Sequence, residues 1–409
     1  MRVLVFAGLL ACGSGTEPVP ADLPAIDETS LTEATRRMTD IGHRMVAMPG
    51  EDRAYDEIVD WLLDAGLEPT ADPFVFDAWR PGTATIEAGG QSFEAHAMSP
   101  SPPTDVTGPL QLQGDAGPGD IGLFSSADGA RAEQFLYAGA AGVDAWVRIS
   151  DFTDHDGSPL VEVGHTLVGS DLAGAGVDQP TGDALRGVVG QEVRLRIDPD
   201  IAYGHESKNV VVRLGDPEAT RRIWITAHYD SWYNSEGAFD NALGVGAWML
   251  LARRAASFDI TGVEVVFLAT SGEEQGLQGS FAWVEEREHL IGPSDLAVTL
   301  DVLWSAEGDF ICMGSTEERL QAAVEAHEAE GLAVVEGGDP GVASDHFPFV
   351  SRGAQAIWCG RWPDRHYHTT EDRLEYLDLG EATKVVQAHW NLLAREAGLD
   401  DAAAPATTP

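Results

Sequence analysis

The sequence predicts an α/β fold, in which a mostly parallel mixed sheet is flanked by helices and carries a β-rich insert. From residue 209 onward, short apolar runs rich in β-branched residues alternate with helical patterns. This alternation is typical of a parallel sheet with helices on its faces. Between residues 79 and 202 it stops, and short β-like segments broken by Gly, Pro and Asp take its place. A separate β-rich unit is therefore expected inside the α/β domain.

Two amphipathic helices are expected ahead of the insert, over residues 31–38 and 51–63. In the second, four apolar residues recur at helical spacing: Tyr55, Ile58, Val59 and Leu62. A strand should follow over residues 67–76.

In the second half of the chain, the first expected strand covers residues 209–214. It should pair with strand 223–227 through the turn at residues 215–217. A buried helix is expected over residues 245–254 and a strand over 263–268. The remaining expected elements are strands at 296–301 and 354–358 and helices at 317–330 and 379–397.

The 409-residue chain carries 25 Lys and Arg against 67 Asp and Glu, a formal net charge of −42. Its only lysines are Lys208 and Lys384. An acidic surface of this kind disfavours nucleic acid as a partner. The sequence also lacks an apolar run of the roughly 18 residues that a membrane-spanning helix needs.

Residues 1–11 are typical of a signal peptide, with one positive charge followed by an apolar run too short to span a bilayer. The end of this segment, Leu-Leu-Ala-Cys with Cys12 last, resembles the bacterial lipobox, in which the cysteine is acylated. Residues 12–25 then have the composition of a tether. We therefore expect an exported bacterial lipoprotein of the cell envelope, with Cys12 as its only membrane attachment.

Gly13 follows the cysteine, which favours the outer membrane where the cell has one. The alternative is an ordinary signal peptide whose cysteine is incidental, which gives an extracellular protein. Two other cysteines, Cys312 and Cys359, each lie at the edge of a strand-like run. Export allows a disulfide between them, and two buried free thiols fit the sequence equally well.

Polar residues gather where the expected strands end. Five of them occupy such positions: His228, Asp230, Glu273, Glu274 and Asp301. The carboxyl ends of parallel strands meet at one edge of a sheet, where active sites lie. Singly, each residue has a structural explanation, such as a loop histidine bonded to a carboxylate or a glutamate pair at a helix N-terminus.

Asp240, ahead of the buried helix, and His368, near the end of the chain, are also unremarkable singly. Together, two imidazoles and several carboxylates without a thiolate suit two zinc ions in open, hydrolytic sites. Glu273 cannot easily bind the same ion as its neighbour Glu274 in the same geometry, so it is free to take a proton from water. Asp230 is placed to orient the imidazole of His228.

The sequence resembles the co-catalytic dizinc peptidases, which include bacterial leucyl aminopeptidases, glutamate carboxypeptidases and glutaminyl cyclases. The resemblance covers about residues 209–398. Five segments match in the order of that family: HYDS (228–231), GAFDNA (237–242), EEQGLQGS (273–280), LD (300–301) and YHT (367–369). A sixth, SDHFPF (344–349), could equally be a plain helix start.

This resemblance implies the zinc exopeptidase fold and two zinc ions per chain. Asp240 would bridge the ions, with His228 and Asp301 completing one site and Glu274 and His368 the other. Glu273 would be the general base, assisted by Asp230. The resemblance also implies a cis peptide bond between Asp240 and Asn241.

By its position in the chain and its pattern of short β-like segments, the insert resembles a protease-associated domain. In family members that carry one, this domain tends to shape or cover the substrate cleft. Such an insert should supply no metal ligand. Its histidines are then surface or loop residues: His96, His155 and His165.

Three positions depart from the family pattern. Thr299 and Trp304 stand where Asn and Gly are common, and Leu243 stands where a small residue is common. None of these departures removes a ligand. Trp304 can narrow the pocket, so no substrate preference is carried over.

We expect an exported zinc aminopeptidase that hydrolyses N-terminal residues of peptides. One alternative is a carboxypeptidase or dipeptidase of the same fold, with Arg361 or Arg365 gripping a substrate carboxylate, although these arginines could equally form surface ion pairs. Glutaminyl cyclases use a single zinc and need fewer ligands, and non-catalytic scaffolds of this fold have lost ligands. The organisation expected is signal peptide 1–11, tether 12–25, N-terminal part of the peptidase domain 26–78, insert 79–202, catalytic domain 203–399 and disordered tail 400–409.

Overall fold

The computed structural model describes residues 23–154, 156–164 and 172–399. Several expectations lie outside these residues: the signal peptide, Cys12, most of the tether, His155, His165 and the tail. Within the described residues, no helix has the length and apolarity that crossing a membrane requires.

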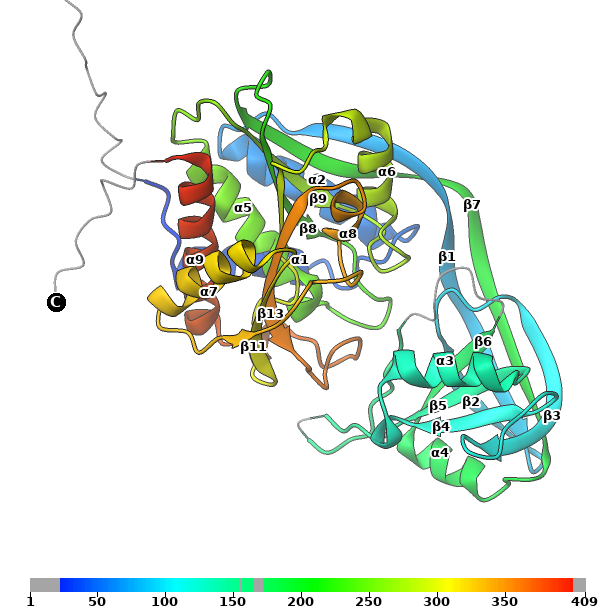
Figure 1. The fold of residues 1–409 in the computed structure, drawn as a ribbon. Coiled ribbons are helices and arrows are strands. Elements are labelled where there is room, and N and C mark those ends of the chain that lie inside the picture. The colour runs from blue at the N-terminus through cyan, green and yellow to red at the C-terminus, as the bar shows by residue number, and fades with distance from the viewer. Residues whose placement is uncertain (1–22, 155, 165–171, 400–409) are drawn as a thin grey trace, which may run out of the picture.

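A mixed sheet runs through the larger lobe (Figure 1). In this lobe the strand order of the described residues is β7-β9-β8-β10-β13-β11-β12, which is part of a 13-stranded sheet that continues through β3 and β1 into the smaller lobe. The bounds are β7 (Glu192–Gly215), β8 (Arg222–His228), β9 (Glu264–Thr270), β10 (Leu296–Thr299), β11 (Asp309–Gly314), β12 (Val335–Glu336) and β13 (Gln355–Trp362). β9, β8, β10 and β13 are parallel, whereas β7 and β11 run antiparallel to β9 and β13. The predicted fold class is confirmed.

One predicted pairing is wrong, because β7 pairs with β9 and not with β8. Glu264, at the start of β9, is buried between Arg213 of β7 and Arg222 of β8, at 2.6 and 2.9 Å. A buried carboxylate requires such partners. The two arginines therefore favour β9 in the position between β7 and β8.

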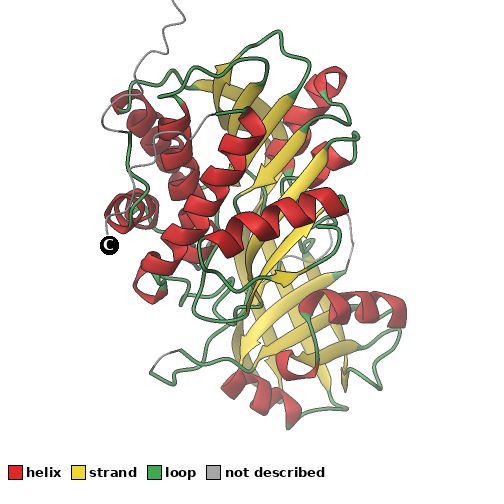
Figure 2. Cartoon of the chain, turned by 60° about the vertical axis from the view of Figure 1, so that its left-hand side comes forward, coloured by secondary structure: helices red, strands yellow, loops and turns green. Residues whose placement is uncertain are grey.

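Helices cover both faces of this sheet (Figure 2). One face carries α1 (Glu28–Thr39), α2 (Pro49–Asp64), α5 (Leu243–Ala255), α7 (Glu317–Ala329) and α9 (Leu379–Ala397). The other face carries α6 (Gln278–Arg287) and α8 (Phe347–Val350). Alternate strand residues face opposite sides, so Ile225 joins the first layer while Trp224 packs on Phe349, with ring centres 4.9 Å apart.

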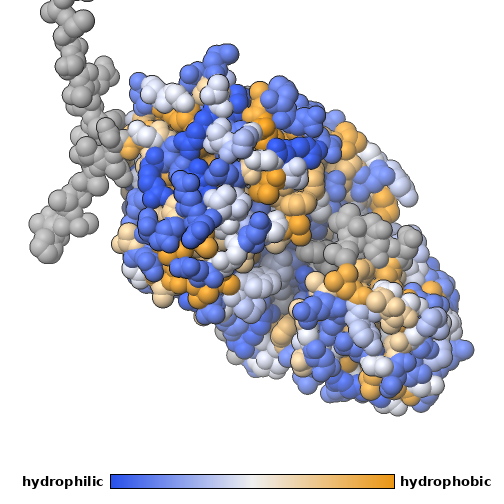
Figure 3. Space-filling model, viewed as in Figure 1, coloured by the Kyte–Doolittle hydropathy of each residue, from blue (hydrophilic) through white to orange (hydrophobic). Residues whose placement is uncertain are grey.

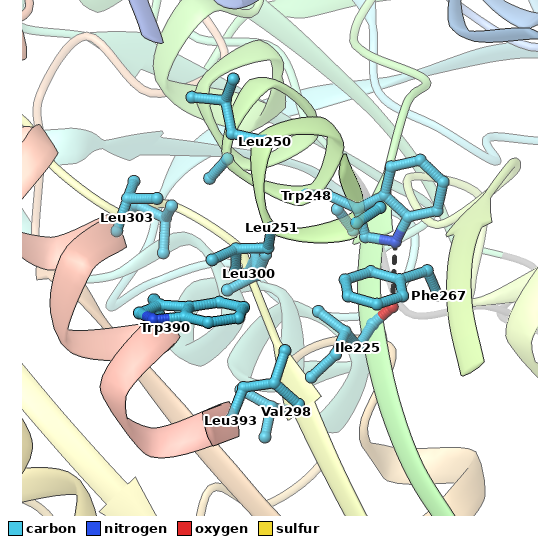
Figure 4. Close-up of a cluster of buried hydrophobic side chains, with 14 of the residues drawn as sticks. Ile225, Trp248, Leu250, Leu251, Phe267, Val298, Leu300, Leu303, Trp390 and Leu393 are labelled. Carbon is cyan, nitrogen blue, oxygen red and sulfur yellow. Dashed lines mark hydrogen bonds between the residues drawn. The ribbon is translucent and has the colours of Figure 1, made fainter. Parts of the chain in front are cut away.

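The core beneath α5 fixes the strands that lead to the site. Trp248 is completely buried, and its indole N–H donates to the carbonyl of Ile225 at 3.0 Å (Figure 4). Phe267 and Trp390 belong to the same apolar cluster. A core of this kind is close-packed, so the strand ends that it supports are held in defined positions.

A long antiparallel ribbon of β1 (Thr70–Ala88) and β7 connects the smaller lobe to the larger one (Figure 1). It also contains β2 (Gln91–Ala97), β3 (Thr104–Leu112), β4 (Ile121–Ser125), β5 (Ala145–Ser150), β6 (Ala173–Asp178), α3 (Arg131–Ala141) and α4 (Gln179–Arg186). The expected boundary at residues 79 and 202 falls inside the ribbon, where Trp79 pairs with Ile201. Figure 3 shows a mostly hydrophilic face that is hollowed where the two lobes meet.

Neighbouring strands bring the two described cysteines together. Cys312 of β11 lies opposite Cys359 of β13, and a disulfide joins them. Of the two alternatives that the sequence leaves open, the structure contains the disulfide.

Candidate metal centre

The polar residues singled out in the sequence converge at one edge of the sheet. His228 ends β8, Glu273 and Glu274 follow β9, and Asp301 follows β10. Asp240 lies in the turn before α5, where its peptide bond to Asn241 is cis, as expected. His368 comes from the loop after β13.

Two groups of potential ligands share Asp240. One contains His228, Asp240 and Asp301, and the other contains Asp240, Glu274 and His368; within each, the ligand atoms lie within 4.8 Å of one another. Asp240 Oδ1 lies 3.0 Å from His228 Nε2, and Asp240 Oδ2 lies 3.0 Å from His368 Nε2. The two carboxylate oxygens of Asp240 therefore face different groups.

The outer members of each group are equally close. Asp301 Oδ1 lies 3.2 Å from His228 Nε2, and Glu274 Oε2 lies 3.2 Å from His368 Nε2. All of these side chains are buried. Glu274 Oε1 is buried too and makes no hydrogen bond within the described part of the chain.

Asp372, which the sequence analysis missed, holds the turn that carries Asp240. Its carboxylate accepts hydrogen bonds from the backbone N–H groups of Phe239 and Asp240, at 2.6 and 3.1 Å. Burial raises the pKa of Asp372 to about 8. Asp372 contacts backbone amides that are far away in the sequence, so no local sequence motif predicts its role.

Asp230 does more than was expected of it. Its carboxylate accepts from the backbone N–H groups of both Glu273 and Glu274, each at 3.2 Å. The same carboxylate lies 3.6 Å from His228 Nδ1, whereas the backbone carbonyl of Asp230 lies closer, at 3.2 Å. Asp230 thus links the two glutamates to His228.

Ser344 gives the sixth matched segment a role beyond starting a helix. Its hydroxyl donates to Asp301 Oδ2 at 2.7 Å, which leaves Oδ1 facing His228. The next residue in the chain, Asp345, accepts a hydrogen bond from the hydroxyl of Thr270 through its carboxylate. The bond from Ser344 fixes the orientation of the Asp301 carboxylate.

Clustered negative charge dominates the electrostatics of the site. Burial raises the pKa of Glu273 and that of Glu274 well above the usual value, and neighbouring carboxylates add to the effect. Burial alone would lower the pKa of His228, but Asp301 and Glu273 outweigh it and raise that pKa well above its usual value. Buried carboxylates in this number call for cations.

The donor set suits zinc. Nitrogen and carboxylate oxygen ligands are the ones that open, hydrolytic zinc sites use. Asp240 presents one oxygen to each group, and Glu274 Oε1 is buried without a hydrogen bond in the described residues. The residues present therefore fit a pair of such ions.

The two arginines near His368 are engaged elsewhere. Arg361 lies over the ring of Trp304, 4.1 Å from its centre, and donates to the carbonyl of Ser305 at 3.1 Å. Arg365 pairs with Glu307 at 2.9 Å. Arg365 therefore forms the surface ion pair that was one of the two alternatives, whereas Arg361 packs on an aromatic ring and bonds to a backbone carbonyl.

The comparison with known families agrees with this geometry. Residues 209–406 match the family described as peptidase family M28. This part of the chain is a peptidase family M28 domain. It is therefore a metallopeptidase, a hydrolase, and the resemblance drawn from its motifs is confirmed.

Two curated relatives are similar to this chain. The aminopeptidase YwaD of Bacillus subtilis is 27% identical over 326 residues, which span 72% of this chain and 68% of that protein. A protein named probable lipoprotein aminopeptidase LpqL, of Mycobacterium tuberculosis, is 25% identical over 266 residues, which span 60% of this chain and 51% of that protein.

Solved structures share the fold. A zinc aminopeptidase from Bacillus subtilis superposes with a TM-score of 0.73 at 21% identity, covering 91% of this chain and 95% of that one. A glutaminyl cyclase from Porphyromonas gingivalis gives a TM-score of 0.53 at 15% identity, covering 92% and 99%. At these identities the likeness concerns the fold alone.

Proposed function

We propose that this M28 peptidase is an exported zinc aminopeptidase that hydrolyses the N-terminal residues of peptides. The observation that carries the proposal is the pair of ligand groups joined by Asp240, with a further buried glutamate, Glu273, next to them in the chain. The zinc aminopeptidase fold of the Bacillus subtilis neighbour and the aminopeptidase relatives support it.

The ligands assigned to two zinc ions are the residues of the two groups. His228, Asp240 and Asp301 would hold one ion, and Asp240, Glu274 and His368 the other. When bound, such a pair lowers the pKa of water and polarises a carbonyl group.

Glu273 is assigned as the general base because it belongs to neither ligand group. Its backbone N–H is held by Asp230 at 3.2 Å, which fixes the start of the side chain beside Glu274. A carboxylate of Glu273 can accept a proton from the attacking water and then donate it to the departing amine.

The alternatives have less support. A carboxypeptidase would need a cation for the substrate carboxylate, and Arg361 and Arg365 are engaged in other contacts. A glutaminyl cyclase needs a single zinc, which leaves part of this ligand set unexplained. A scaffold that had lost its chemistry would not need Glu273 or the complete set.

Export is proposed from Cys12 and from the likeness to a relative named as a lipoprotein. We also propose that the smaller lobe is a protease-associated-like insert. None of the candidate groups found in the described residues includes a residue between 79 and 202, which supports an insert that supplies no ligand.

A substrate panel tests the proposed activity directly. The purified, zinc-loaded chain is assayed on free aminoacyl peptides, on the same peptides with blocked N-termini, and on N-terminal glutaminyl peptides. Cleavage that requires the free α-amine is the expected result. Cleavage of blocked peptides from the carboxyl end would support a carboxypeptidase, ring closure would support a cyclase, and no turnover with no bound zinc would support a scaffold.

A further inference from the structure

Arg44 is a completely buried arginine that no catalytic step above uses. It lies between α1 and α2, outside residues 209–406 that match the M28 family. Its exposed fraction is 0%. Arginine is rarely buried so fully unless its charge and its N–H groups are satisfied.

The guanidinium donates to three backbone carbonyls at the base of the candidate metal centre. Nε reaches Tyr229 at 2.8 Å, Nη1 reaches Glu236 at 2.5 Å and Nη2 reaches Gly237 at 2.9 Å. The backbone N–H of Arg44 also donates to the hydroxyl of Ser231 at 3.0 Å. One side chain therefore ties together both ends of the segment 229–237.

The segment held by Arg44 connects two residues of the site. Asp230 directly follows Tyr229, and Asp240 lies three residues after Gly237. Gly237 has φ +59°, and a Cβ added there would come within 2.9 Å of Arg44 Nη2 and 2.5 Å of the carbonyl oxygen of Asp240. The turn is therefore closed tightly around the guanidinium.

The charge of Arg44 is balanced at a distance. Among the described residues its hydrogen bonds are to neutral carbonyl groups and one hydroxyl, while the acidic groups whose ionised forms act on its charge are Asp372, Asp230, Asp240 and Glu274. Burial lowers the pKa of Arg44 to about 10, so the side chain stays cationic at neutral pH.

We propose that Arg44 is a positioning residue of the zinc site, whose forked donors hold segment 229–237 so that Asp230 and Asp240 reach their places. This inference rests on the proposed zinc function. It makes the N-terminal helices part of the catalytic apparatus, because the residue that closes the metal-bearing turn comes from between them.

Whether substitution of Arg44 raises or lowers zinc affinity distinguishes a positioning role from a simple effect of its charge. A cation close to the ligands repels a second cation, so its charge alone weakens zinc binding and removing that charge would tighten it. Positioning has the opposite sign, because a loosened turn no longer presents Asp240 correctly. If Arg44 contributed only to folding stability, its substitution would leave the zinc affinity of the folded protein unchanged.

The experiment measures zinc dissociation constants by competition with a chelator, well below the unfolding temperature, for the full chain and three variants. Arg44→Gln removes the charge and the fork, whereas Arg44→Lys keeps the charge but cannot span three carbonyls. Arg37→Gln is the matched control, since Arg37 is an exposed arginine of α1 that pairs with Glu33 and Glu57. Circular dichroism verifies that each variant is folded.

Both Arg44 variants should bind zinc about 10- to 100-fold more weakly than the wild type, and the Arg37 variant should match the wild type. Unchanged or tighter binding in both Arg44 variants would overturn the inference while leaving the zinc function intact. A wild type that binds no zinc would overturn both. If neither Arg44 variant folds, Ser231→Ala removes one bond of the same clamp and should weaken zinc binding in the same direction; unchanged binding there would count against the clamp.

Discussion

The backbone N–H of Val163, in the smaller lobe, donates a hydrogen bond to the carbonyl of His368 at 3.3 Å. His368 has φ +61°, a region that few residues other than glycine adopt, so its backbone must be held there. Trp232, which belongs to the apolar core of the smaller lobe, places its ring 5.1 Å from the imidazole of His368. The smaller lobe thus contacts a proposed ligand, and its described residues contribute to none of the candidate metal-binding groups.

Glu162 holds in place the loop segment, residues 160–164, that makes this contact. Its carboxylate pairs with Arg131 at 2.8 Å and Arg148 at 3.0 Å, and its N–H donates to Ser150 at 2.7 Å. Glu162→Gln leaves two largely buried arginines without their counter-charge, so residues 160–164 should loosen. We expect zinc affinity to fall roughly tenfold, as for other residues that orient ligands.

The matched control for Glu162 is Asp105→Asn, which breaks the exposed pair of Asp105 with Arg194 in the same lobe. Chelator competition should find its zinc affinity unchanged. Equal zinc affinity in the Glu162 variant and the wild type would show that the smaller lobe does not support His368.

The buried pair His327 and His389 should make stability depend on pH. Burial lowers the pKa of His327 to about 3 and that of His389 to about 4. Their N–H groups donate to the carbonyls of Ala323 and Val385. Above pH about 6.5 both histidines are neutral in the folded and in the unfolded chain. Below that pH they bind protons in the unfolded chain but stay neutral in the folded chain, so the free energy of unfolding falls as the pH drops toward 4.

Each pH unit in that window is worth about 1.4 kcal/mol for one such histidine, or about 2 kcal/mol between pH 6.5 and 5. Urea unfolding at pH 7 and pH 5 should therefore lose less stability in His389→Gln than in the wild type, by about that amount. The control is His289→Gln, at an exposed histidine outside the core. A wild-type loss that persists in full in His389→Gln would contradict the assignment.

Lipid attachment at Cys12 predicts a change of location. Cys12→Ser should move the protein from the membrane fraction to the soluble fraction of the producing cell, because the anchor is the only attachment expected. Mass spectrometry of the wild-type N-terminus provides the second readout. A wild type that is already soluble and unacylated would rule out the anchor.

The sequence located the candidate ligands because each is tied to a feature that sequence records. His228, Glu274 and Asp301 stand at the ends of strands whose apolar runs are readable, and parallel strands end at a common edge. The order of those strands was less accessible. The place of β9 depends on Glu264, which reads as an ordinary charged residue until the strands are assembled around it.

Residues that act through the backbone could not be predicted in this way. Asp372 accepts from the amides of Phe239 and Asp240, and Arg44 donates to carbonyls far along the chain. Neither bond has a spacing or a composition that marks it, because any residue supplies a backbone amide or carbonyl. Such partners emerge only from the tertiary structure.

We propose that Glu273 transfers protons while five other residues hold the metal. Glu273→Gln keeps size and hydrogen bonding but cannot accept a proton, so it should retain two zinc ions and lose turnover by roughly a hundredfold or more. Asp240→Ala removes the carboxylate shared by both groups, so it should lose zinc as well as activity. The most direct measurement is zinc content together with kcat on an aminoacyl substrate, for both variants and the wild type. We expect a zinc-loaded but inactive Glu273 variant and a zinc-depleted Asp240 variant. Full activity in Glu273→Gln or full zinc occupancy in Asp240→Ala would contradict the proposed roles.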